Sequence, residues 1–142
     1  MIIKESKIIY NEIKIPGRPI KLKNKSSIVK FVSKVMGSVN SPAEYLIVIA
    51  IDDNAQPVSF TIMGCSVEDE VHFSISSVLR FVILSGCNKF ITIHNHPNDV
   101  CKFSKEDIKS AIELKKAASV VGLELVSDYL IYSGGCLRNK NI

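Results

Sequence analysis

The chain has 142 residues, of which 46% are hydrophobic and 23% charged, a composition that fits one globular domain with its own core. No apolar run is longer than seven residues, which excludes a membrane-spanning helix of about 20 residues, and the N-terminus lacks the apolar core of a signal peptide. The four cysteines are widely spaced, without a Cys-x-x-Cys pair. We therefore expect reduced thiols in a cytoplasmic protein that has no membrane partner.

The net charge of +4 is unevenly distributed along the chain. Residues 1–43 carry nine basic and two acidic side chains, a net charge of +7, whereas residues 44–142 carry nine basic and 12 acidic ones, a net charge of −3. Such asymmetry can indicate a nucleic-acid-binding arm, but few aromatic residues stand among the basic ones. A solvated basic face is the preferred interpretation, and nucleic-acid binding stays open as the alternative.

The first half of the chain is predicted to form a strand, a helix and a hairpin. Residues 7–15 alternate between apolar and polar, which favours a strand, and a Pro-Gly turn follows them. Ser26–Ser27 offer caps for a helix over residues 26–36, where apolar residues recur at helical spacing. Residues 45–51 are continuously apolar, which predicts a central strand buried on both faces, with residues 57–63 as its hairpin partner.

The second half is predicted to alternate between helices and strands. Acidic residues 68–70 lead into a helix that continues to Ile83, and residues 89–96 then form a strand. Residues 104–121 give the best helical pattern, and residues 123–132 form the last strand. Alternating strands and helices predict an α/β or α+β layered domain with a mixed sheet.

Two of the three histidines suggest a metal site. His94 and His96 stand two residues apart on a predicted strand, so their rings project to the same face and could meet one ion. Alone, this pair is equally consistent with polar residues at an exposed strand end. Asp107 heads the apolar stripe of the next helix, where an inward carboxylate needs a partner such as a cation. Ser104-x-x-Asp107 also resembles a capping box, which is compatible with a ligand role for Asp107.

Catalysis at such a site requires further groups. Three protein ligands leave a tetrahedral zinc ion one open position for water, and a base must then take the proton of that water. Glu44, immediately before the buried run, is the candidate base, although a solvated residue at a strand start is its simpler interpretation. The hydroxyl of Ser104 could stabilise the developing oxyanion.

The series Glu44, His94-Asn95-His96-Pro97, Ser104 and Asp107 resembles the JAMM motif of the MPN+/JAB metalloprotease superfamily, and most closely the RadC-like JAB domains of bacteria. The resemblance implies a mixed sheet flanked by helices, related to the cytidine deaminase-like architecture, over residues 26–142, with residues 1–25 as a basic strand and turn extension. It further implies a metallohydrolase that cuts amide or isopeptide bonds in a peptide or protein substrate. By this resemblance, the Zn²⁺ ligands are His94, His96 and Asp107. Glu44 is then the general acid/base, and Ser104 helps to stabilise the oxyanion.

Two features depart from the family pattern. The loop 98–103 lacks the usual glycine and prolines, and Tyr129 stands where a histidine commonly follows the acid that Asp128 matches. The third histidine, His72, is interpreted as a structural residue, or as one that contacts the metal ligands and not the metal itself. The alternative function is a non-catalytic binding module of the same fold in a DNA-associated context. The sequence names neither the substrate nor an oligomeric state.

Overall fold

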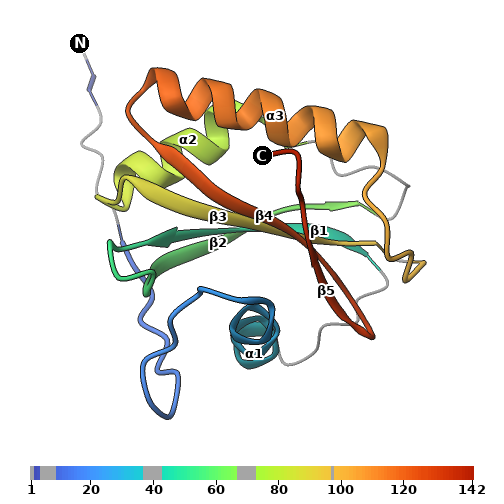
Figure 1. Cartoon of the computed structure of the whole chain (residues 1–142). Helices are drawn as coiled ribbons and strands as arrows, with labels where there is room; N and C mark the ends of the chain where they lie inside the picture. The colour runs from blue at the N-terminus through green and yellow to red at the C-terminus, as the bar shows by residue number, and fades with distance from the viewer. Residues whose placement is uncertain (1, 4–8, 37–42, 67–72, 97) are drawn as a thin grey trace.

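A five-stranded mixed sheet forms the centre of the protein (Figure 1). The computed structural model describes residues 2–3, 9–36, 43–66, 73–96 and 98–142. The strand order is β2-β1-β3-β4-β5; β3 and β4 are parallel, and the other neighbouring pairs are antiparallel. The strands are β1 (Glu44–Ile51), β2 (Pro57–Ser66), β3 (Lys89–Asn95), β4 (Glu124–Tyr132) and β5 (Gly135–Arg138).

Helices cover both faces of this sheet. In Figure 1, α1 (Lys25–Met36) lies on one face, and α2 (Ile75–Leu84) and α3 (Lys105–Val120) lie on the other. The predicted layered α+β fold with a mixed sheet is therefore confirmed. Among the described residues, no helix is long and apolar enough to cross a bilayer.

The continuously apolar run of β1 follows from this three-layer arrangement. Successive side chains of a strand point to opposite faces, and both faces of β1 are covered. Ile47 and Ile49 pack in the core beneath α1, whereas Leu46 and Val48 pack beneath α2 and α3. Every residue of β1 is buried, including Glu44 at its start, as predicted for a central strand.

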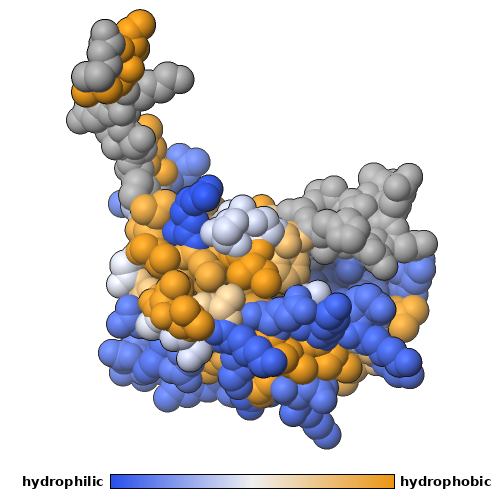
Figure 2. Space-filling view, turned by 90° about the horizontal axis from the view of Figure 1, so that it is seen from above, coloured by the Kyte–Doolittle hydropathy of each residue, from blue (hydrophilic) through white to orange (hydrophobic). Residues whose placement is uncertain are grey.

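The outer surface of α2 and α3 has an apolar area at one end (Figure 2). The exposed apolar side chains at the C-terminal ends of these two helices are Ile83, Leu84, Val120 and Val121. Asp107 lies in the first turn of α3, so the apolar area and the predicted metal ligand are at opposite ends of that helix.

The prediction of a strand over residues 7–15 is wrong for residues 9–15, which form no strand; residues 7 and 8 lie outside the described part. A strand requires a partner to pair its backbone groups, and alternation alone does not provide one. Ile9 and Ile13 are instead exposed, and the Tyr10 hydroxyl donates to the carbonyl of Leu84.

Three further comparisons with the expected secondary structure concern the cap of α1, the start of α2 and an additional strand. Asn24, not Ser26, caps α1: its Oδ1 accepts from Ser27 N at 2.9 Å, and Ser27 Oγ accepts from Asn24 N at 3.2 Å. The acidic lead-in at 68–70 lies outside the described residues, and α2 begins at Ile75. Strand β5, which pairs with the end of β4, was not predicted.

Candidate metal centre

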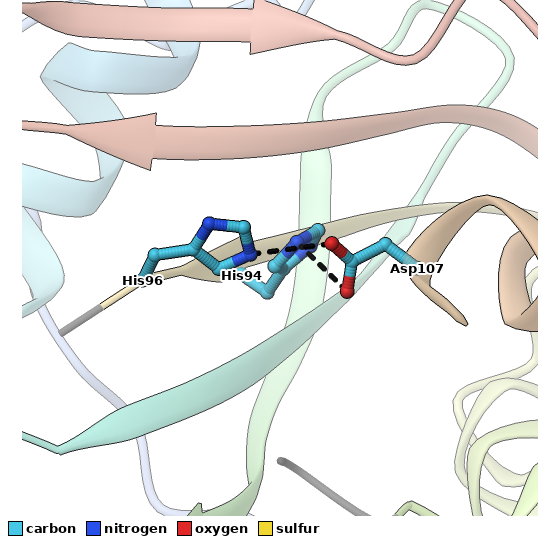
Figure 3. A group of neighbouring side chains, drawn as sticks. All are labelled: His94, His96 and Asp107. Carbon is cyan, nitrogen blue, oxygen red and sulfur yellow. Dashed lines mark hydrogen bonds and ion pairs between the residues drawn. The ribbon is translucent and has the colours of Figure 1, made fainter. Parts of the chain in front are cut away.

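The two histidines and Asp107 converge at one end of the sheet (Figure 3). His94 lies near the end of β3, and His96 follows one residue after that strand. His96 Nε2 lies 3.2 Å from Asp107 Oδ2, and His94 Nε2 lies 3.6 Å from Asp107 Oδ1. One donor atom from each of the three residues falls within 4.8 Å of the other two. The two-residue spacing thus places both rings beside Asp107 of α3, as predicted, although the strand itself ends at Asn95.

The N-terminus of α3 fixes the Asp107 carboxylate. Ser104 Oγ accepts from Asp107 N at 3.0 Å, and Asp107 Oδ2 accepts from Ser104 N at 2.6 Å, which completes a reciprocal capping box. Further along the same face, Ala111 and Leu114 are buried. The cap and the contact with the histidines therefore coexist in one side chain, as the sequence pattern allowed.

The charges in this group perturb one another. Burial raises the pKa of Asp107, but its contacts with His94 and His96 outweigh burial and hold that pKa far below its ordinary range. The hydrogen bond to Asp107 raises the pKa of His96, and the Glu44 carboxylate adds a smaller contribution in the same direction. A carboxylate and two imidazoles thus form an electrostatically coupled group that attracts a cation or protons.

The arrangement fits a divalent transition-metal ion. His94 Nε2 is buried and is the one buried side-chain nitrogen or oxygen without a hydrogen-bond partner among the described residues. An orphaned buried nitrogen costs free energy unless it has a partner, and a metal would be one. Ligand atoms at 2.0–2.1 Å from a tetrahedral zinc ion lie about 3.4 Å apart, and each histidine Nε2 has one Asp107 oxygen near this distance, Oδ2 at 3.2 Å from His96 and Oδ1 at 3.6 Å from His94.

Glu44 and Ser104 line the same cavity as the three candidate ligands. The cavity has a volume of about 760 Å³ and also contains apolar walls from Phe73 and Phe103. The Glu44 side chain is buried at 6% exposure at the first position of β1. The fold therefore brings all five predicted site residues together, although Glu44 and His94 are 50 positions apart in the chain.

Asn95, which lies in the motif between the two histidines, has a role near the site that the sequence did not predict. The regular pairing of β1 with β3 ends at Leu46 and His94. Beyond it, Asn95 Oδ1 accepts from Tyr45 N at 2.8 Å and Asn95 Nδ2 donates to Ala43 O at 3.0 Å. These bonds hold the backbone on both sides of Glu44. The available signal was the position of Asn95 between two same-face histidines, which directs its side chain to the opposite face.

Asp128 supports the site from β4. It is 4% exposed, accepts from Thr92 Oγ1 at 2.8 Å and Asn139 Nδ2 at 3.0 Å, and its Oδ1 lies 4.0 Å from His94 Nδ1. Burial raises the pKa of this carboxyl group. Tyr129 packs in the core on the α1 face, away from the ligands, so its side chain has no place among them. His72 lies outside the described residues.

A family model and three curated relatives match this chain. The family model described as "RadC-like JAB domain" matches residues 22–138. A UPF0758 protein of Psychrobacter cryohalolentis is 28% identical over 63% of this chain and 40% of the relative, and one of Coprothermobacter proteolyticus is 22% identical over 72% and 45%. A third, from Staphylococcus haemolyticus, is 33% identical over 38% of this chain and 24% of its own length. The chain thus spans less than half the length of these curated relatives.

Proposed function

The chain belongs to the family of RadC-like JAB domains, and from this we propose that it is a zinc-dependent hydrolase that cuts an amide or isopeptide bond. The convergence of His94, His96 and Asp107 at a cavity, with His94 Nε2 buried and without a hydrogen bond to any described residue, carries the proposal. These three residues would hold Zn²⁺. Three protein ligands from imidazole and carboxylate are typical of catalytic zinc sites, which keep a position open, whereas structural sites use four.

Glu44 is proposed as the group that moves the proton. When bound, zinc supplies Lewis acidity: it lowers the pKa of water to about 7 and polarises a carbonyl group. The Glu44 carboxylate would take the proton of the attacking water and return it to the amine that leaves. Its burial in the cavity and the Asn95 bonds that flank it support this role, because a base must stay in place through both transfers.

Ser104 is proposed to assist at the substrate carbonyl. Its Oγ accepts the amide hydrogen of Asp107, so its own hydroxyl hydrogen is available to donate. A hydroxyl at the wall of the cavity would stabilise the negative charge that develops on the substrate oxygen. The apolar side chains of Leu46, Phe73 and Phe103 in the same walls would exclude water from a bound peptide segment. A peptide or isopeptide-linked protein is therefore the proposed substrate class.

The test is a substrate screen with Glu44→Gln as the inactive variant. Zinc-loaded protein is assayed against peptide and isopeptide conjugates, and zinc content is measured in parallel. Glu44→Gln should keep its zinc and lose about 10²-fold to 10⁴-fold in turnover, because the amide cannot accept the proton. Glu124→Gln, an equally conservative change at the exposed start of β4, is the control. Undiminished turnover in Glu44→Gln would exclude it as the base, and a protein that binds no zinc would end the hydrolase proposal.

A non-catalytic binding module remains the second candidate, because one segment of the chain is strongly basic. Residues 14–34 contain seven cations and no acid, and all seven side chains are exposed. Such a segment would suit the phosphates of nucleic acid. The complete ligand set favours the hydrolase, since a scaffold has no need of it. Binding to duplex DNA that weakens steeply with salt, in a protein without zinc, would favour the module instead.

A further inference from the structure

A side chain ties the loop after His96 to a distant hairpin. The Asp99 carboxylate accepts from the backbone N–H of Ser133 at 2.7 Å and also from the Ser133 hydroxyl. Ser133 directly follows β4, in the turn that leads into β5. The loop beside the metal centre is therefore joined, across 34 positions of sequence, to a turn that the sheet holds in place.

The backbone of Asp99 explains how this loop forms without the glycine usual in RadC-like proteins. Its φ is +55°, in the left-handed region that glycine adopts freely and that aspartate and asparagine tolerate better than other residues. The aspartate thus fills a position that favours glycine. It also provides a carboxylate, which glycine lacks, for the contact with Ser133.

The same loop contacts His96 on the side away from Asp107. Asp99 N donates to the carbonyl of His96 at 2.9 Å. The carbonyl oxygen of the next residue, Val100, lies 3.0 Å from His96 Nδ1. Because a carbonyl oxygen can only accept, Nδ1 must carry a hydrogen in this contact. Nε2, which lies 3.2 Å from the Asp107 carboxylate, is then the ring nitrogen that can give up its hydrogen and offer a lone pair to a metal ion.

We propose that Asp99 and Ser133 form a clamp that positions His96 for metal binding. The clamp holds the Val100 carbonyl against Nδ1, keeps the hydrogen on Nδ1 when a metal binds, and so leaves Nε2 as the ligating atom. Partners of this kind orient ligating histidines and set their tautomer in metal sites generally. Asp99 is thus a positioning residue that acts through His96, and its role rests on the proposed function of His96 as a zinc ligand.

Zinc affinity gives the first test. Asp99→Gly keeps the left-handed backbone accessible and removes the clamp, whereas Ser133→Ala removes only the hydroxyl bond. Asp53→Gly makes the same chemical change at an exposed aspartate that bonds Lys89, at the opposite end of β3. In competition titrations with a zinc chelator, Asp99→Gly should bind zinc about tenfold or more weakly, Ser133→Ala should be weakened less, and the control should be unchanged. Wild-type affinity in Asp99→Gly would overturn the clamp.

The Nδ1 hydrogen of His96 gives a second test that needs no metal. In metal-free, ¹⁵N-labelled protein at a pH where the ring is protonated, both ring nitrogens carry hydrogen, because the Val100 carbonyl and the Asp107 carboxylate are both acceptors. The Nδ1 hydrogen should exchange with solvent more slowly in the wild type than in Asp99→Gly, and the control Asp53→Gly should behave as the wild type. Equally fast exchange in the wild type and Asp99→Gly would overturn the clamp. A wild type that binds no zinc but keeps this difference in exchange would refute the hydrolase and leave the clamp standing. If Asp99→Gly does not fold, Ser133→Ala undergoes both measurements.

Discussion

Zinc should raise the thermal stability of the wild-type protein but not of Asp107→Asn. The asparagine keeps an oxygen that can accept from Ser104 N, so the cap of α3 is retained while the anionic ligand is lost. Each histidine already has its Nε2 near one oxygen of the Asp107 carboxylate, at 3.2 Å for His96 and 3.6 Å for His94, and one ligand atom from each of the three residues lies within 4.8 Å of the others. Little rearrangement of Asp107 is therefore needed, and most of the binding free energy should appear as stabilisation of the folded state.

The size of the shift follows from linkage. With free zinc at about 100 times its Kd, binding adds about 2.7 kcal/mol to the free energy of unfolding. An unfolding entropy of about 2 cal/mol/K per residue amounts to about 0.3 kcal/mol/K for 142 residues. The expected rise in Tm is thus about 9 °C.

The assay is differential scanning fluorimetry of chelator-treated protein with and without added zinc. Glu106→Gln is the matched control, because it removes the neighbouring exposed charge from the same first turn of α3. Wild type and Glu106→Gln should show the rise in Tm, and Asp107→Asn should show little or none. An equal rise in Asp107→Asn would refute the reasoning, because zinc would then bind elsewhere in the chain.

Three further predictions concern pH and the first helix. The hydrogen bond to Asp107 raises the pKa of His96 above its ordinary value of about 6.5. Protons should therefore compete with zinc for this ring, and the zinc affinity measured by titration should weaken below about pH 7. An affinity that does not depend on pH would contradict this prediction. In metal-free protein the free energy of unfolding should fall as the pH rises through the raised pKa of His96, because the attraction between His96 and Asp107 is then lost. Denaturant unfolding at several pH values measures this loss. Asn24→Ala should lower the free energy of unfolding by about 1 kcal/mol through loss of the α1 cap, whereas Ser26→Ala should change it little; the reverse order would show that Ser26 is the cap.

Most of the correct predictions came from local sequence patterns. The unbroken apolar run of residues 45–51 requires cover on both faces, which only a central strand between helix layers provides. The two-residue spacing of His94 and His96 places both rings on one face of any strand. The pattern of Ser104 and Asp107 predicts a capping box because its hydrogen bonds span only three positions. These inferences involve neighbours in the chain, so no knowledge of the fold is needed.

Contacts between segments that are distant in the chain could not be predicted from such local patterns. Alternation in residues 7–15 predicted a strand, but a strand exists only where another strand pairs with it, and the described residues 9–15 have none. The capping role of Asn24 was hidden by two adjacent serines that suit the same position equally well. The role of Asn95 depends on the point at which β1 and β3 stop pairing, which no local pattern encodes.

The sequence by itself determined the layered class of the fold, the face shared by the two histidines and the helix that presents Asp107. Only the tertiary structure decided that Glu44 lines the same cavity, because β1 must first lie beside β3 in antiparallel register. It likewise decided that Asp99 meets Ser133, because the β4–β5 turn must first reach the loop after His96. Periodicity reports which way a side chain points, whereas the strand order reports what it meets.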